Sequence, residues 1–147
     1  MVQTILGAGG VIGNETAKEL AKLNKKVRLV SRNPKSVTGN EELVSASLLK
    51  EEQVNKAVEG SDVVYLTVGY EYKAKVWEDV WPKTMRNVLK ACEAHGSRLV
   101  FFDNLYLYKP DFKAKAITEE NPVGPESKKG KVRAEIAIQL MEAVEKG

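Results

Sequence analysis

The stretch Gly7-Ala8-Gly9-Gly10-Val11-Ile12-Gly13 decides the fold of this chain. It follows a short apolar run, Val2–Leu6, and opens onto a helical pattern that extends to Leu23. A strand, a glycine turn and a helix start in direct succession form a phosphate cradle, because glycines admit close backbone approach and helix N-terminal N–H groups point at the anion. The glycines have G-x-x-G-x-x-G spacing. The alternative is a tight turn in an α/β protein that binds no nucleotide.

The composition is that of one ordinary globular domain. The chain has 147 residues, of which 43% are apolar and 29% are charged, so residues 1–147 are expected to form a single domain. A formal charge of +3 does not argue for a nucleic acid partner. A single cysteine, Cys92, excludes an intrachain disulfide and suits a reducing compartment. With no apolar run of membrane-spanning length and no signal peptide pattern, we expect a cytoplasmic protein without a membrane partner.

Strand-like and helical segments alternate along the chain. The expected strands are Val2–Leu6, Lys26–Val30, Leu43–Ala46, Asp62–Val68 and Leu99–Phe102. Alternation argues for parallel βαβ units, and the glycine-rich first turn favours a doubly wound α/β sheet in the order 3-2-1-4-5 with helices on both faces. A five-stranded flavodoxin-like order is the alternative. It is disfavoured because flavin phosphate loops are usually richer in serine and threonine than this turn.

The helical segments have recognisable apolar stripes. In the first, Ile12, Thr16, Leu20 and Leu23 fall on one helical face, and the last has Val132, Ile136, Leu140 and Val144 on one stripe. Trp77 and Trp81 lie one turn apart in the long helical segment, where we expect core or subunit contacts, and Pro82 marks a kink or a new helix start. Residues 103–125 are predicted to form a long loop.

Ligands bind such sheets beyond the carboxyl ends of the strands, at the switch in strand order. The segments expected there are Gly7–Gly13, Ser31–Arg32, Thr67–Tyr70 (with Thr67, Val68 and Gly69 as contacts) and Asp103–Tyr108.

An NAD site needs an acidic residue after the second strand to accept from the ribose 2′-OH, yet none occurs from Leu20 to Asn40. Since a guanidinium pairs well with a 2′-phosphate, we predict NADP, held by Ser31 and Arg32, with NAD as second choice. The alternative is that Arg32 is a solvated loop residue.

Four motifs together resemble the NAD-dependent epimerase/dehydratase family, the extended or atypical short-chain dehydrogenases/reductases. They are the glycine turn, Ser31-Arg32-Asn33-Pro34, Ser61-Asp62-Val63-Val64-Tyr65 and Asn104-Leu105-Tyr106-Leu107-Tyr108. The resemblance covers nearly the whole chain and implies a Rossmann-type NAD(P)-binding domain. It also implies a serine or threonine after strand five, a Tyr-x-x-x-Lys pair on the next helix, and a C-terminal substrate region.

The sequence departs from this family pattern at each catalytic position. Asn104 stands near the family serine, and aligning Lys131 with the family lysine puts Ser127 at the tyrosine position. A serine hydroxyl is far less acidic than the phenol that serves as acid/base. Ser47, followed by Leu48, stands near the family's adenine-side aspartate. The substrate region is expected to be absent or truncated.

Other candidate residues have two interpretations each. Tyr106 and Tyr108 have two interpretations: one of them replaces the phenol of the family's catalytic tyrosine, or both only pack against their neighbours. Lys131 contacts the nicotinamide ribose or joins a solvated group of basic residues with Lys128, Lys129 and Arg133. His95 is interpreted as structural at a helix end and Cys92 as buried and inert, and no metal site is expected.

Three function classes follow. The chain is an NADP-dependent reductase, epimerase or dehydratase that acts on a small molecule with a displaced acid/base, a dinucleotide-binding module without chemistry, or an α/β interaction protein without a ligand. The fifth strand is expected to be a sheet edge that needs cover, which favours a homodimer through this strand or through the Trp77/Trp81 helix. The alternative is that the final helix and the preceding loop cover the edge.

Overall fold

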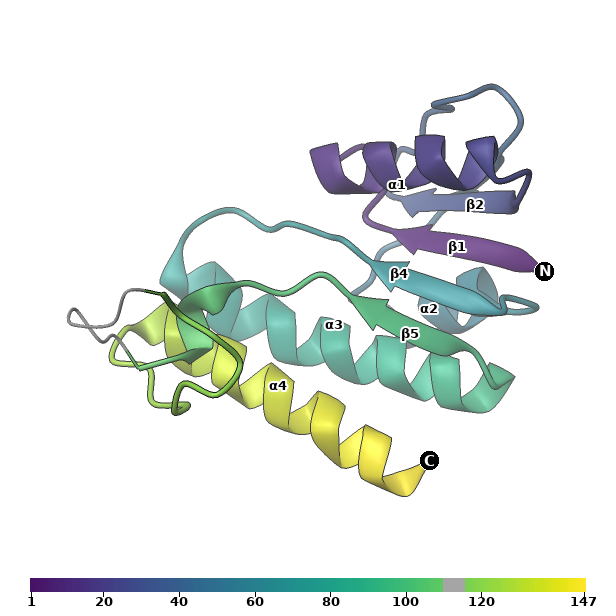
Figure 1. Cartoon of the computed structure of the whole chain (residues 1–147). Coiled ribbons are helices and arrows are strands. Elements are labelled where there is room, and N and C mark those ends of the chain that lie inside the picture. Colours follow the sequence, from purple (N-terminus) through teal and green to yellow (C-terminus); the bar gives the residue numbers. More distant parts are fainter. Residues whose placement is uncertain (110–115) are drawn as a thin grey trace. The chain divides into compact units, whose positions relative to one another are not determined.

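The computed structural model describes residues 1–109 and 116–147, and it has the predicted alternation of strands and helices (Figure 1). In chain order the elements are β1 (Val2–Leu6), α1 (Val11–Lys22), β2 (Lys26–Ser31), β3 (Glu42–Ser45), α2 (Glu51–Val58), β4 (Val63–Leu66), α3 (Ala74–His95), β5 (Arg98–Phe101), the 3-10 turn η1 (Leu105–Leu107) and α4 (Lys128–Lys146). Among the described residues, no helix combines the length and apolar character needed to cross a membrane.

The five strands form one parallel sheet in the order β3-β2-β1-β4-β5, which confirms the predicted doubly wound topology. The order reverses at β1, because the chain moves to one side through β2 and β3 and then crosses to β4 and β5. Leu6 pairs with Val30 of β2 and Leu66 of β4, so the glycine turn leaves β1 where both neighbouring strands end. The switch in strand order therefore coincides with the glycine turn.

The chain divides into two compact units. The sheet unit comprises Met1–Gly69 and Asn87–Phe102, and the aromatic unit comprises Tyr70–Arg86 and Asp103–Gly147. Helix α3 contributes its first half to the aromatic unit and its second half to the sheet unit. The two units are described separately below.

Helices cover both faces of the sheet unit, with α1 on one side and α2 on the other (Figure 1). On the α1 side, a buried cluster joins Ala17 and Leu20 of the helix to Ile5, Val27 and Leu29 of the sheet. On the opposite side the buried side chains include Leu6, Val30, Val54, Val64, Leu66 and Val88. These strands are buried on both faces, as expected for a parallel sheet between helices.

The apolar face of α1 is buried only in part. The helix buries Gly13, Ala17 and Leu20, whereas Ile12 is 37% exposed and Leu23 is 64% exposed. A Cβ at Gly13 would lie 3.0 Å from the Gly7 carbonyl oxygen, so the first turn packs against the strand through its smallest residue. The requirement for close approach shifts the buried face by about one residue position toward the small side chains.

Two further boundaries differ from the predictions. β4 ends at Leu66 rather than Val68, because the backbone of Val68 passes directly beneath Gly7 instead of continuing the strand ladder. α3 continues through Pro82, although the proline removes one helical hydrogen bond. The predicted loop from position 103 contains η1 and a bridge between Tyr108 and Val123, and residues 110–115 of it lie outside the described part.

The core of the aromatic unit is built on tryptophans. Trp77 and Trp81 of α3 are 6% and 3% exposed, so of the two predicted roles, core or subunit contact, the structure has the core role. Their ring centroids lie 6.2 Å apart, and the Tyr70 ring packs edge-on against Trp81 at 5.1 Å. From α4, Val132 and Ile136 are buried, whereas Val144 at the end of the predicted stripe is 63% exposed.

Candidate functional site

The glycine turn has a conformation that requires glycine at its first position. Gly7 has φ +104°, and a Cβ there would lie 2.5 Å from both the Cα and the amide nitrogen of Val68. Gly9 also has a positive φ, +97°, but a Cβ there would meet nothing within 4 Å. The turn is therefore closed toward the sheet at Gly7 and open toward solvent at Gly9.

Hydrogen bonds hold this turn in place from two sides. The amide nitrogens of Gly7 and Ala8 both donate to the carbonyl oxygen of Val30, at 3.0 and 3.1 Å. The Gly9 amide donates to the Asn14 side-chain oxygen at 3.1 Å. Asn14 was not among the predicted site residues. The sequence feature that could have identified Asn14 is its position: a polar side chain in the second turn of a helix that follows a glycine loop.

Helix α1 begins at this turn with an open N-terminus. Gly10 is the N-cap residue and has no side chain to accept from the first-turn amides, and the first turn contains no acidic residue. The amides of Val11 and Ile12 are among those that lack an acceptor within the helix. Both residues are exposed, as are Gly9 and Gly10. An open helix start with a positive dipole end is favourable for an anion.

The end of β2 presents a cation and no carboxylate. Arg32 is exposed, and within the described ranges its guanidinium has no ion pair or hydrogen bond; only its carbonyl is engaged, by the Ser45 hydroxyl at 2.8 Å. Ser31 is half-buried, and its carbonyl accepts from Ala46. Glu42 pairs with Arg28 at 2.8 Å, away from this tip.

Glu41 is committed to closing its own loop. Its carboxylate accepts from the hydroxyl of Ser36 and from the amide and hydroxyl of Thr38, at 2.6 to 2.9 Å. Partial burial opposes ionisation, but these hydrogen bonds outweigh it and lower the pKa of Glu41 to about 2. The carboxylates of Glu41 and Glu42 therefore both have protein partners, and neither is available to accept a hydrogen bond from a ribose.

The segments after β3 and β4 have different roles. Leu48 is 7% exposed and its carbonyl accepts from the Asn87 amide at 2.9 Å, so its side chain belongs to the core. Ser47 is half-buried and donates its backbone amide to Gln53. The amide and the hydroxyl of Thr67 both donate to the Leu6 carbonyl, which fixes Thr67 and the following Val68 as the floor of the glycine turn. Gly69 is exposed beyond this floor.

In the aromatic unit, two predicted catalytic residues cap helices. The Asn104 side chain accepts from the Tyr106 amide at 3.1 Å and begins η1. The Ser127 hydroxyl accepts from the Gly130 amide at 3.0 Å and begins α4. Lys131 follows in the first turn of α4 and is exposed. Capping is a sufficient structural reason for Asn104 and Ser127.

Tyr106 is paired with a second phenol. The Tyr72 hydroxyl donates to the Tyr106 hydroxyl at 3.0 Å, and the Lys129 ammonium lies 3.0 Å from the centre of the Tyr72 ring. The hydrogen bond with Tyr72 and the repulsion between two phenolates raise the pKa of Tyr106, while Lys129 opposes this effect. Tyr106 is accordingly not an acidified phenol in this arrangement.

The placement of Arg133 removes it from the solvated group of basic residues that was one of the two interpretations of this helix start. Its side chain is 2% exposed, ion-paired with Asp103 and lying 4.5 Å from the centre of the Trp81 ring. Burial lowers the pKa of Arg133, and the Asp103 carboxylate partly restores it. The pair fixes the segment after β5 to α4, and only the tertiary structure reveals it.

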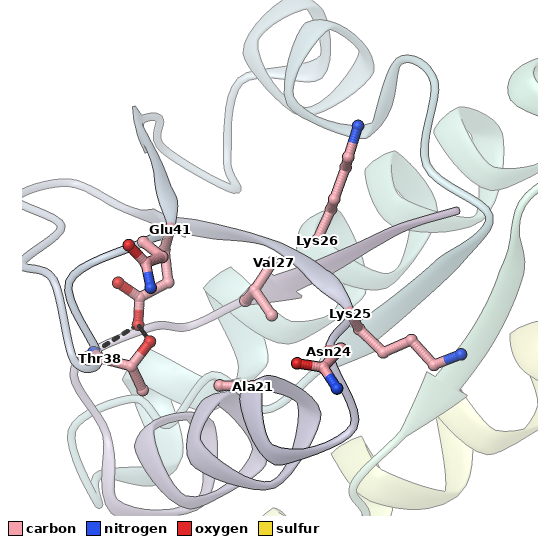
Figure 2. Close-up of a pocket in the computed structure, with 8 residues that line it drawn as sticks. Ala21, Asn24, Lys25, Lys26, Val27, Thr38 and Glu41 are labelled. Carbon is pink, nitrogen blue, oxygen red and sulfur yellow. Dashed lines mark hydrogen bonds between the residues drawn. The ribbon is translucent and has the colours of Figure 1, made fainter.

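A hollow of about 280 Å³ lies near the start of β2, at the opposite end of this strand from the glycine turn (Figure 2). Lys25 and Lys26 border it but point away from one another and from Glu41 (Figure 2). The hollow therefore gathers no convergent set of polar groups. Within the described ranges there is also no cluster of histidine, cysteine or acidic residues suited to a metal ion. The glycine turn is the better ligand site, because the first-turn amides of α1 that follow it have no acceptor within the helix.

A family model described as NAD(P)H-binding matches residues 7–145 of this chain. The chain belongs to the NAD(P)H-binding family. The match begins at Gly7, the glycine whose conformation defines the turn, and includes every candidate site residue. A comparison with curated proteins gave no match.

Solved structures share the fold of this NAD(P)H-binding protein. Uronate dehydrogenase from Agrobacterium tumefaciens has a TM-score of 0.85 and 22% identity, over 99% of this chain and 56% of that one. UDP-glucose 4-epimerase from Thermus thermophilus, in complex with NAD, has a TM-score of 0.81 and 21% identity, over 97% and 50%. WbmH from Bordetella bronchiseptica, in complex with NAD+, has a TM-score of 0.82 and 20% identity, over 97% and 52%. The chain spans about half the length of these proteins.

Proposed function

We propose that this NAD(P)H-binding protein binds a nicotinamide dinucleotide with the pyrophosphate over Gly7–Gly13, and that it prefers NADP. The fit of the pyrophosphate is supported by the open start of α1 and by the absence of any side chain at Gly9 and Gly10. When bound, the cofactor would supply hydride transfer. The chain's own contribution is to bind and orient it through the first-turn amides of α1, which have no acceptor within the helix.

The preference for NADP depends on one observation, the Arg32 guanidinium at the end of β2, which has no partner among residues 1–109 and 116–147. A 2′-phosphate there would gain a charge-assisted hydrogen bond, whereas the 2′-OH of NAD would find no carboxylate acceptor. Glu41 and Glu42 do not compete, because Glu41 closes its loop and Glu42 pairs with Arg28. Ser31 supports the same site as a short polar neighbour.

The test is a fluorescence titration with NADPH and NADH. NADPH should bind more tightly, and Arg32→Ala should weaken NADPH binding by about tenfold to a hundredfold, the worth of one charge-assisted hydrogen bond, while leaving NADH unchanged. Arg86→Ala is the matched control, because Arg86 is also exposed but belongs to α3. Equal affinities of the unmodified protein for the two cofactors would contradict the NADP preference.

We assign this chain to a binding role with a reduced catalytic set rather than to full family chemistry. Asn104 and Ser127 cap helices, and Tyr106 has a raised pKa, so none of them supports an acidified proton donor. Reductase, epimerase or dehydratase activity on a small molecule is the second candidate, since Tyr106 and Lys131 are both exposed. Turnover of NADPH with carbonyl substrates, lost in Tyr106→Phe and retained in Tyr108→Phe, would favour the enzyme.

A further inference from the structure

Two tyrosines of the aromatic unit meet through their hydroxyl groups. Tyr72, which precedes α3, donates a hydrogen bond to the Tyr106 hydroxyl of η1 at 3.0 Å, and the two ring centroids lie 6.2 Å apart. The two residues are 60% and 44% exposed. The ring carbons at which phenoxyl radicals couple are the ortho carbons, which are bonded to the carbon that bears the hydroxyl and therefore lie beside this contact. An oxidant in solution can reach this pair of phenols, which are already in position to join.

The tyrosine pair is the outer end of a chain of aromatic rings. The Trp77 ring centroid lies 5.6 Å from that of Tyr72 and 6.1 Å from that of Tyr106. Trp81 follows at 6.2 Å from Trp77, and Tyr70 at 5.1 Å from Trp81. These are ordinary packing distances for aromatic rings, and rings in contact exchange electrons readily. A positive charge created by oxidation anywhere along the chain can therefore move to its exposed end.

The surroundings of Trp77 do not favour an oxidised state of that residue. The side chain is buried, and its indole nitrogen has no hydrogen-bond partner among residues 1–109 and 116–147. An indole that has lost an electron is a strong acid, yet here its proton has no acceptor. A buried charge without a partner is unfavourable. Oxidised Trp77 is therefore expected to take an electron from a neighbouring tyrosine.

The tyrosine pair provides the proton acceptor that Trp77 lacks. The Tyr72 hydroxyl donates to the Tyr106 oxygen, so Tyr72 can lose its proton together with an electron. The Lys129 ammonium lies 3.0 Å from the centre of the Tyr72 ring, and repulsion disfavours a second positive charge on that ring. Both effects couple the loss of the electron to the loss of the proton. The product is a neutral phenoxyl radical at the exposed end of the chain of rings.

We propose that Tyr72 and Tyr106 form an oxidative modification site, at which a soluble one-electron oxidant joins them in an intrachain dityrosine, with Trp77 as the relay. Each phenol gives one electron to the oxidant and its hydroxyl proton to water. The two phenoxyl radicals form a carbon–carbon bond between ortho positions, and the hydrogen on each of these carbons moves through water to the phenol oxygen. In total two electrons and two protons leave the protein. This assignment does not depend on whether a dinucleotide is bound.

The test is oxidation of the dilute protein with tris(bipyridine)ruthenium(III), generated by light with persulfate as the electron acceptor. The unmodified chain should gain dityrosine fluorescence, lose the mass of two hydrogen atoms, and yield a linked pair of tryptic peptides, residues 57–73 and 99–113. Tyr72→Phe and Tyr106→Phe should each lose this linked pair. Tyr108→Phe is the matched control and should retain it, because Tyr108 lies in the same peptide as Tyr106 and directly follows η1. Circular dichroism verifies that each variant is folded, and either phenol variant serves if the other is not.

Two further measurements separate this site from random oxidation. The fraction of cross-linked chains should not rise with protein concentration, because both phenols belong to one chain. Trp77→Phe should slow the reaction more than Trp81→Phe, because Trp77 contacts both tyrosines, whereas the Trp81 ring packs on Tyr70 and Trp77. Absence of dityrosine, a linked pair that persists in Tyr72→Phe, cross-linking that rises with concentration, or equal effects of the two tryptophan substitutions would overturn the proposal.

Discussion

Replacing Gly7 with alanine is the sharpest test of how the glycine turn is built. The substitution has two separate costs. One is conformational, because φ at Gly7 is +104°, where a non-glycine residue costs about 1–3 kcal/mol. The other is steric, because the new Cβ would lie 2.5 Å from the Cα and the amide nitrogen of Val68. Backbone atoms cannot rotate away as a flexible side chain can.

Gly9→Ala separates these two costs. Gly9 has nearly the same φ, +97°, but a Cβ there would meet nothing within 4 Å. Gly9→Ala should therefore reduce the free energy of unfolding by about 1–3 kcal/mol from the conformational term alone. Gly7→Ala adds an overpacking cost of about 1–3 kcal/mol and should total about 2–6 kcal/mol. For a chain this size, that is a large share of a total of about 5–15 kcal/mol.

The assay is urea unfolding followed by circular dichroism, with a parallel NADPH titration of whichever variants remain folded. A larger loss for Gly7→Ala than for Gly9→Ala is expected, by about 1–3 kcal/mol. If the two variants lose the same stability, the close approach of Gly7 to Val68 is not present in solution, and the description of the turn's floor is wrong. If Gly7→Ala is folded and binds NADPH normally, the pyrophosphate does not lie over this turn.

Two further predictions concern charged groups. Asp103→Asn should destabilise the protein by about 3 kcal/mol, because it leaves the buried Arg133 charge uncompensated. Arg133→Met should cost less, because the Asp103 side chain that it leaves unpaired is 29% exposed. Thermal unfolding measures both losses, and a larger loss for Arg133→Met would contradict the interpretation of a buried ion pair. Glu41 has its pKa lowered from 4.5 to about 2, so its contribution is present above pH 4.5 and is lost as the pH falls toward 2. At neutral pH Glu41→Gln should cost about 1 kcal/mol, allowing for solvent screening, and the difference from the unmodified protein should vanish near the folded pKa of about 2 in urea titrations at fixed pH. If the difference in unfolding free energy between Glu41→Gln and the unmodified protein is unchanged at that pH, the effect of the substitution is steric and does not arise from the loss of the carboxylate charge.

Local sequence determined the framework of this protein. The glycine turn, placed between an apolar run and a helical pattern, predicted the first βα unit, and the alternation of elements predicted the order β3-β2-β1-β4-β5. These features depend on short-range physics: backbone freedom at glycine, hydrophobic periodicity and the handedness of crossovers. The motifs around the strand ends were enough to indicate the family that the matching model identifies.

Tertiary structure alone decided which side chains those elements bury. Periodicity places Ile12 and Leu23 on the apolar face of the first helix, but the helix packs on Gly13 and Ala17, because close approach to the strand favours the smallest side chains. Arg133 looked like one of several solvated cations, yet it is buried against Asp103 and Trp81, residues 30 and 52 positions earlier in the chain. Burial of a charge is a property of the partners that fold around it, and partners distant in sequence leave no local pattern.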